Sequence, residues 1–229
     1  MSMPFYVAPE QVMKDRADYA RKGIAKGRSL CAVSYDDGIL ICAENSSSTL
    51  RKVSEIYDRI AFAGVGRYSE FDQLRVAGVR HADMKGYAYS REDVDAQSLA
   101  NAYAQMLNHT FTHEMKPMEV EILVAEIGDE RSRDELFHIL YDGSVVDEDR
   151  FSVLGGEAEA IAARLEESFE PGMALDVALR AAVSALSGPD RELSAPELEV
   201  AVLSRANGRR KFARIEDEAL AELLGSATT

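Results

Sequence analysis

The sequence predicts an α+β fold, a four-layer αββα sandwich in which two packed sheets carry helices on both outer faces. Two observations lead to this prediction. Segments with strand-like patterns come in two blocks, and a pair of helix-like segments follows each block. A third observation argues against an alternating βαβ fold, because no G-x-G-x-x-G run follows an expected strand and no G-x-x-x-x-G-K-[ST] phosphate loop occurs.

The first expected element is a helix from Pro9 to about Ile24. Pro9 suits the first helical position, Glu10 favours the positive end of the helix dipole, and Gly23 marks the end. An imperfect apolar stripe along this helix implies that it packs against something. The stripe consists of Val12, Ala17, Tyr19, Ala20 and Ile24. Residues 1–8 show neither a helix nor a strand period, so we expect a mobile segment there.

A first block of strands follows, each short and rich in branched or aromatic residues. The expected strands are Leu30–Tyr35, Ile39–Glu44, Val53–Asp58 and Ile60–Gly64. If Asp37-Gly38 forms the two-residue turn of the first hairpin, Ser34 pairs with Ile41 and Val33 with Cys42. Cys31 then lies diagonal to Cys42, a geometry that does not favour a disulfide, and we expect a reducing compartment.

The rest of the chain repeats this order of strands and helices. Helices are expected at Ser69–Met84 and Asp95–Met115, and the second of these is the most clearly periodic segment. The remaining expected elements are strands at Glu119–Ile127, Glu135–Tyr141 and Phe151–Leu154, helices at Glu157–Phe169 and Met173–Leu186, strands at Glu197–Ser204 and Lys211–Ile215, and a helix at Asp217–Leu224.

Composition limits the classes of function. The chain has 229 residues and no linker-like stretch, so one domain covering 9–229 is expected behind the segment 1–8. A formal net charge of −14 argues against non-specific binding to nucleic acid. The segment Met13–Asp18 is highly charged where a signal peptide would be apolar, and no apolar run approaches membrane-spanning length. A cytoplasmic protein without a membrane partner is therefore expected.

The usual catalytic and metal-binding patterns are weak. His109 and His113 are four residues apart, which could place both on one metal, but H-E-x-x-H is absent and no further ligand is evident. A polar helix edge is the favoured interpretation, so no metal and no cofactor are expected. Neither Cys31 nor Cys42 has the context of a nucleophile, and no G-x-S-x-G elbow occurs.

The stretches 35–45 and 51–66 are the most informative part of the chain. They are typical of strand, tight turn, strand, loop and two further strands, with Glu44 and Lys52 at the mouth of the loop. This pattern closely resembles the opening of a proteasome subunit, which has the fold of N-terminal-nucleophile hydrolases. The resemblance extends from Pro4 to Leu224, and the run Asp18-Tyr-Ala-Arg21 is similar to the end of the first helix in α-type subunits. The start Met-Pro-Phe-Tyr-Val-Ala lacks the Tyr-Asp-Arg gate motif and resembles the actinobacterial version.

The resemblance implies a non-catalytic member of the T1 peptidase family. Catalytic relatives begin the first strand with a free N-terminal threonine that acts as nucleophile, whereas this chain has Arg28 or Ser29 there, behind a helix. One alternative is a self-processed hydrolase using Ser29, which requires cleavage after Gly27 or Arg28. Another alternative is a stand-alone acidic binding module that forms no ring.

The same resemblance implies partners and site residues. Seven copies would form an outer ring on each end of a four-ring barrel, next to rings of catalytic β subunits. A ring-shaped ATPase would insert its C-terminal tail into a pocket between adjacent α subunits, where Lys52 meets the terminal carboxylate and Asp18 and Gly66 line the pocket. Retention of Lys52 is equally consistent with a structural ion pair to Glu44. The gate at the pore would consist of Phe5, Tyr6, Val7 and Ala8.

Overall fold

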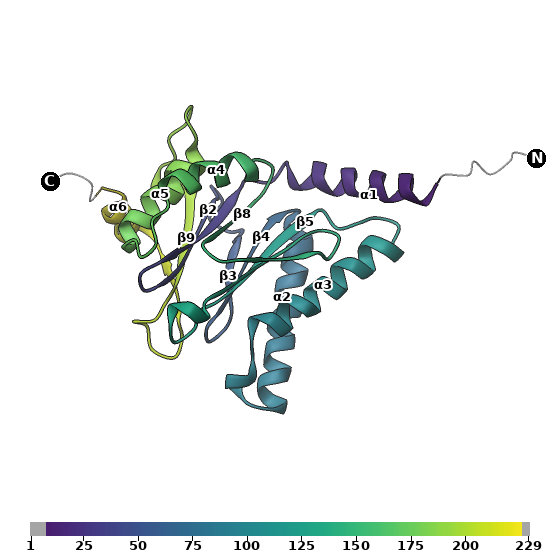
Figure 1. Cartoon of the computed structure of the whole chain (residues 1–229), viewed down its shortest axis with the longest axis horizontal. Helices are drawn as coiled ribbons and strands as arrows, with labels where there is room; N and C mark the ends of the chain where they lie inside the picture. Colours follow the sequence, from purple (N-terminus) through teal and green to yellow (C-terminus); the bar gives the residue numbers. More distant parts are fainter. Residues whose placement is uncertain (1–7, 226–229) are drawn as a thin grey trace, which may run out of the picture.

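The computed structural model of the chain describes residues 8–225 and shows two packed antiparallel sheets of five strands each (Figure 1). The first sheet has the order β10 (Phe212–Ile215), β9 (Leu198–Ser204), β2 (Gly38–Glu44), β1 (Leu30–Tyr35) and β8 (Phe151–Leu154). The second sheet has the order β3 (Val53–Tyr57), β4 (Ile60–Gly66), β5 (Val120–Glu126), β6 (Glu135–Ile139) and β7 (Val145–Glu148).

Helices cover the outer face of each sheet, which confirms the predicted αββα sandwich. The helices α4 (Ala158–Ser168), α5 (Leu175–Ser187) and α6 (Asp217–Gly225) share a core with the first sheet. The helices α2 (Tyr68–Ala88) and α3 (Ala96–His113) share one with the second. Short 3-10 turns occur at Arg91–Asp93, Arg131–Arg133 and Ala195–Glu197. Among residues 8–225, no helix is both long and apolar enough to cross a membrane.

A third core lies between the two sheets and is rich in alanine. Along β1, Leu30 and Ala32 face this inner layer, while Cys31 and Val33 face α5 and its neighbours. This alternation follows from the two-residue period of a strand, and both sets are apolar because both faces of the sheet are buried. The inner layer contains Ala20, Ala32, Ala43, Ala61, Ala63, Ala125 and Ala201.

The predicted register of the first hairpin is wrong. The turn residues are Asp36 and Asp37, so Ser34 pairs with Ile39 and Cys31 lies directly opposite Cys42. The two aspartates are held in the turn because the backbone N–H groups of Asp37 and Ala206 donate to their carboxylates.

Gly38 belongs to the strand instead of the turn. A side chain there would collide with the carbonyl oxygen of Leu203 on β9, so the close approach of β9 requires the glycine. The two cysteines are free and fully buried.

Two further differences concern the end of one helix and a strand that was not predicted. Helix α2 continues to Ala88, four residues beyond the predicted end at Met84. Strand β7 was not expected, because it is an edge strand whose Val145 and Val146 are exposed and give no alternating apolar pattern.

The first helix, α1 (Pro9–Ile24), extends beyond the sandwich (Figure 1). Its C-terminal half is anchored, because Ala20 and Ile24 belong to the core between the sheets. Gly23 lies so close to Glu119 that any side chain there would collide with the carboxylate. The N-terminal half is exposed, and Val12 and Met13 keep 36% and 39% of their surface in solvent.

Candidate functional site

Lys52 stands at the entrance to β3, and its side chain reaches back to the turn between α1 and β1. Its ammonium donates a hydrogen bond to the backbone carbonyl of Arg28, with an Nζ–O distance of 2.5 Å. Among residues 8–225 this is the one hydrogen bond found for a group that carries three donors. Burial lowers the pKa of Lys52 to about 8, while the nearby charges of Glu44 and Glu199 act in the opposite direction.

Gly66 meets the same turn from the other side. Its backbone nitrogen lies 2.9 Å from the position that a Cβ atom on Gly27 would take, so the two glycines bring their backbones together. Gly66 also has φ of 111°, a conformation that other residues avoid, and a Cβ there would collide with the carbonyl of Glu119. The turn at 27–28 therefore gathers the Lys52 ammonium and the Gly66 backbone in one place.

Asp18 does not join this group within the chain. It lies on α1, partly exposed, and its ion pair is with Arg21 at 3.6 Å. No contact links it to Lys52 or Gly66 in the described part of the chain.

Ala8 precedes α1, and its carbonyl accepts hydrogen bonds from Gln11 and Val12. The other expected gate residues, Phe5, Tyr6 and Val7, lie outside the described residues.

Glu44 is engaged by two arginines. It forms ion pairs with Arg28 and with Arg191, and the Arg191 Nη1–Glu44 Oε1 distance is 3.0 Å. Lys52 is not among its ion-pair partners within residues 8–225 and feels Glu44 as a nearby charge. The geometry therefore assigns Lys52 a carbonyl as its direct partner in place of the ion pair that the sequence left open.

Glu199 is a site residue that the sequence did not reveal. It lies on β9, where all seven residues are buried, and only 3% of its surface is exposed. Its carboxylate accepts the backbone N–H groups of Lys52 at 2.8 Å and Val53 at 3.2 Å. The available signal was an acidic residue inside the apolar run Leu198–Leu203, because an unpaired carboxylate would be too costly to bury there.

Ser29 lies inside the chain at the start of β1 and is buried. Its carbonyl accepts the N–H of Glu44 at 3.1 Å, and its hydroxyl faces Gly155, where a Cβ atom would lie 2.6 Å from it. A free N-terminal amine at this position would require cleavage of the chain.

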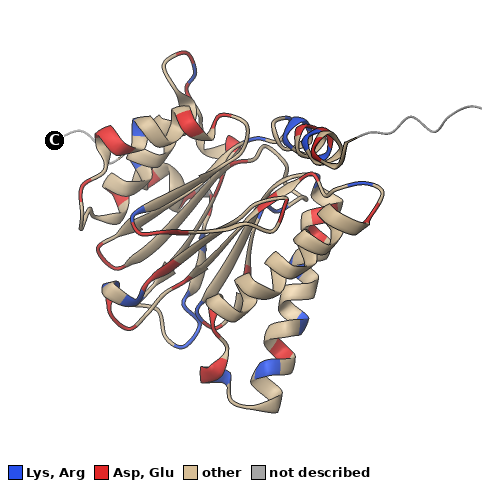
Figure 2. Cartoon of the chain, turned by 45° about the vertical axis from the view of Figure 1, so that its right-hand side comes forward, with Lys and Arg blue, Asp and Glu red and all other residues tan. Residues whose placement is uncertain are grey.

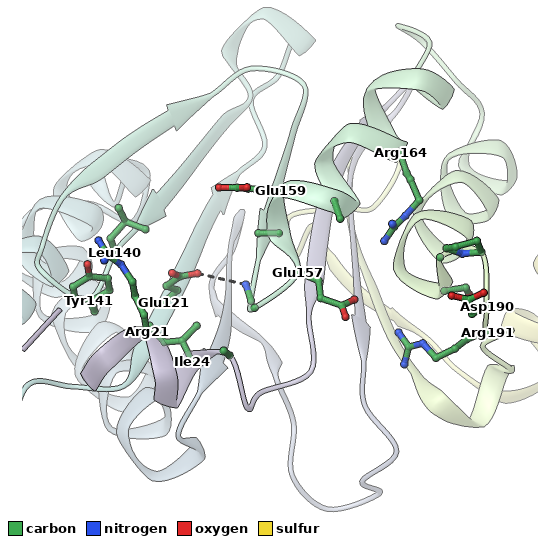
Figure 3. A pocket seen from close by; sticks show the side chains of 18 residues that line it. Arg21, Ile24, Glu121, Leu140, Tyr141, Glu157, Glu159, Arg164, Asp190 and Arg191 are labelled. Carbon is green, nitrogen blue, oxygen red and sulfur yellow. Dashed lines mark hydrogen bonds between the residues drawn. The ribbon is translucent and has the colours of Figure 1, made fainter. Parts of the chain in front are cut away.

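The largest cavity described, of about 950 Å³, opens where the C-terminal end of α1 meets β5 and the start of α4 (Figure 3). One wall carries Arg21 and Glu121, and the opposite wall carries Arg164, Asp190 and Arg191. Positively and negatively charged side chains both line the cavity, so its charge favours neither anionic nor cationic ligands. Lys52, Gly66 and Asp18 do not line this cavity.

The histidine pair and the surface charges add little to the site. The rings of His109 and His113 stack at 4.7 Å, and no cluster of three metal-ligating side chains occurs in the described part of the chain. Both charge signs are interspersed along α1 (Figure 2).

Comparison with known proteins identifies the family. The profile described as "Proteasome subunit" matches residues 24–203, most of the chain. A protein named proteasome subunit alpha from Acidimicrobium ferrooxidans is 61% identical over 225 residues, which cover 98% of this chain and 97% of that protein. Proteins of the same name from Nocardioides and Thermobifida fusca are 58% and 57% identical, covering 98% and 99% of this chain and 90% and 92% of those proteins.

The matched range contains the Lys52 turn, Glu44, Glu199 and every strand of the second sheet. The relatives extend the similarity to nearly the full length, α1 included. The chain therefore belongs to the proteasome subunit family, and the relatives that it resembles from end to end are α subunits from actinobacteria.

Proposed function

We propose that this chain is the non-catalytic α subunit of a bacterial 20S proteasome core in the cytoplasm. Seven copies form each outer ring, next to the rings of β subunits that carry the threonine protease activity. The rings control substrate entry and bind the C-terminal tails of a ring-shaped ATPase that delivers tagged proteins. The names of the relatives support the assignment as an α subunit.

The absence of catalysis by this chain is supported by the position of α1. Ala20 and Ile24 of this helix belong to the core between the sheets, so the segment before β1 is part of the fold. Cleavage before Ser29 would remove this segment and the buried side chain of Ile24 with it. The loss of one large core side chain lowers the free energy of unfolding by about 2–5 kcal/mol.

The docking role is carried by the Lys52 ammonium. Burial already disfavours its charge, and its described hydrogen bond leaves two of three donors for a ligand. A C-terminal carboxylate would supply both the missing charge and the missing acceptors. Gly66 offers backbone at the same turn, and Asp18 on α1 is proposed to line the pocket where two subunits meet.

Ring assembly is proposed to use the exposed apolar side chains of α1. Val12, Met13 and Tyr19 are apolar or aromatic and exposed on a helix that extends beyond the sandwich. Such a surface is typical of residues that a neighbouring subunit covers.

The test of docking is the substitution Lys52→Ala in assembled barrels. The tail carboxylate then lacks its cation, which costs a few kcal/mol and weakens binding about a hundredfold. Arg51→Ala is the matched control, because Arg51 is the adjacent cation but pairs at the surface with Glu216 at 3.3 Å. Normal activator binding by the Lys52 variant would refute the docking role.

The test of gating is deletion of Ser2–Ala8, with α1 retained. We expect faster peptide hydrolysis without activator, because apolar side chains in seven clustered tails no longer obstruct the pore. Covalent inhibitors should react with the β subunits as before. Equal peptide rates at matched assembly would show that these residues are not a gate.

A second candidate, the self-processed hydrolase, is favoured by one observation. Lys52 donates to the carbonyl of the Arg28–Ser29 peptide bond, the bond whose cleavage would free the Ser29 amine. The intact mass of the purified protein separates the two proposals, because processing removes the 28 residues before Ser29. An unprocessed mass supports the α subunit.

A further inference from the structure

The Glu199 carboxylate is saturated with donors from three directions. One oxygen accepts the N–H of Lys52 at 2.8 Å and the side-chain amide of Asn45 at 2.7 Å. The other oxygen accepts the N–H of Val53 at 3.2 Å and the guanidinium of Arg214 at 2.7 Å. A carboxylate has about four acceptor sites, so every one of them is engaged.

These bonds cross from one sheet to the other. Glu199 and Arg214 lie on β9 and β10 of the first sheet, whereas Val53 begins β3 of the second. Arg214 also donates to the carbonyl of Val53 at 2.5 Å. Both sides of the Val53 residue are therefore fixed from the opposite sheet.

The fixed backbone sets the direction of the Lys52 side chain. Lys52 is the residue immediately before β3, where regular strand pairing with β4 begins at Val53. The described backbone bonds of Lys52 are its N–H to Glu199 and its carbonyl, which accepts from Gly64 at 3.1 Å. Loss of the Glu199 bond leaves the side of Lys52 that faces the first sheet without an anchor.

We propose that Glu199 is a positioning residue for the docking lysine: by holding the N–H groups of Lys52 and Val53, it aims the Lys52 ammonium at the turn where a C-terminal carboxylate binds. This inference rests on the docking function proposed above. Glu199 acts through Lys52 and touches no ligand itself.

A buried and saturated carboxylate also stabilises the fold, so the experiment must separate position from stability. The chain offers a matched control at the other end of β9. There Asp134 accepts a hydrogen bond from Arg205 at 2.5 Å and another from the N–H of Gly128 at 3.0 Å. This bridge also joins the two sheets, about 20 Å along the strand from Glu199.

The experiment compares Glu199→Gln with Asp134→Asn in assembled barrels. The probes are a synthetic peptide of the last ten residues of the ring ATPase with a free C-terminal carboxylate, and the same peptide amidated. Wild-type barrels should bind the free carboxylate at least tenfold more tightly than the amide. Glu199→Gln should reduce this ratio about tenfold, because an amide NH₂ replaces an acceptor that faces N–H groups. Asp134→Asn should leave the ratio unchanged even where it lowers the melting temperature equally.

The outcomes distinguish this inference from the docking proposal. If Lys52→Ala keeps the wild-type ratio, docking itself is refuted. If Lys52→Ala loses the ratio and Glu199→Gln keeps it, docking stands and the positioning role is overturned. An equal loss of the affinity ratio in Glu199→Gln and Asp134→Asn would also overturn the positioning role, because the loss would then follow from lower stability of the fold. Should Glu199→Gln barrels not assemble, Glu199→Asp replaces them, since the shorter side chain draws the carboxylate away from both N–H groups while keeping its charge, and an unchanged ratio again overturns the inference.

Discussion

The two ends of β9 carry the same kind of polar bridge but differ in the lysine beside it. At the Ser204 end, next to Asp134 and Arg205, Lys211 donates to the carbonyls of Arg205 at 2.9 Å and Asn207 at 2.8 Å. At the Leu198 end, next to Glu199, Lys52 donates to a single carbonyl. Lys211 therefore uses two of its donors to hold the loop after β9, whereas Lys52 uses one donor in the described structure and leaves two for a ligand.

The difference teaches how a functional group can be recognised in a fold without a catalytic centre. Burial lowers the pKa of Lys52, so its charged form is disfavoured in the isolated chain. A residue that reduces stability where an apolar one would fit is a candidate for function. The predictions below compare the two ends, beginning with the largest expected effect.

Substitution by alanine should destabilise the fold strongly at Gly66 and hardly at all at Gly208. At Gly66 the added Cβ collides with the Glu119 carbonyl at a φ of 111°, so Gly66→Ala should cost about 3 kcal/mol or more and impair assembly. Gly208, in the loop after β9, has no atom within 4 Å of such a Cβ, and its substitution should change stability by less than about 0.5 kcal/mol. Thermal unfolding and native mass measure both. Equal melting temperatures would mean that the approach of Gly66 to the Glu119 carbonyl is looser than described.

Substitutions at Lys52 and Lys211 should separate an effect on activator-stimulated degradation from an effect on the stability of the fold. Lys52→Met should abolish activator-stimulated degradation while leaving Tm unchanged or higher, because a desolvated charge is removed. Lys211→Met should retain stimulation but lose about 1–2 kcal/mol, a fall in Tm of several degrees. A large fall in Tm for Lys52→Met would make this residue a structural lysine like Lys211.

The pH dependence should differ between docking and folding. Because the pKa of Lys52 is about 8 in the fold, the ammonium is charged below that pH, and docking should weaken about tenfold by pH 9. The folded pKa is lower than the unfolded one, so the unfolded chain binds more protons above pH 8. The Lys52 contribution to stability therefore rises with pH while docking falls.

Titrations of wild-type barrels against Lys52→Met barrels isolate this group from the other titrating residues. Affinity for the free-carboxylate peptide gives the docking curve, and chemical denaturation gives the stability curve. Docking that does not change from pH 7 to pH 9 would contradict a charged lysine in the pocket.

The two cysteines near the middle of β9, on β1 and β2, should not react with thiol reagents in the folded chain. Cys42 pairs with Val200 there and faces Cys31, and both thiols are fully buried. Burial raises the pKa of Cys42 to about 12 and that of Cys31 well above its ordinary value, with the Cys42 thiolate contributing to the latter. Thiol reagents should label neither residue until the chain unfolds, which mass spectrometry of native and denatured samples can check. Rapid native labelling would reveal opening of the first sheet.

Local patterns were sufficient to predict most of the fold. The helix at 9–24 and the strand at 30–35 were predicted with their observed bounds, because caps and apolar periods are carried by neighbouring residues. The turn at Asp36-Asp37 was missed because Asp37 is bound by Ala206 and Gly38 is held in the strand by the close approach of Leu203, and both partners are more than 160 positions away. Strand β7 was missed because an exposed edge needs no apolar alternation.

The candidate site was only partly accessible from the sequence. Lys52 and Gly66 came from the family resemblance, and the structure then brought both to the turn at 27–28. Glu199 could not be found in this way, because two of its four partners are backbone amides nearly 150 positions away. Nearly every residue has a backbone N–H group. A side chain that binds such groups therefore has no particular residue type as its partner, and the sequence does not reveal the pair.

The alanine-rich layer between the sheets has a mechanical consequence. Alanine has no side-chain rotamers, so the seven alanines of this layer lose no side-chain entropy on folding and have no alternative rotamer to adopt under load. At these alanines a force applied at one edge cannot be absorbed by a change of side-chain rotamer. We therefore expect the two sheets to move together at these alanines when a load acts on the Lys52 turn.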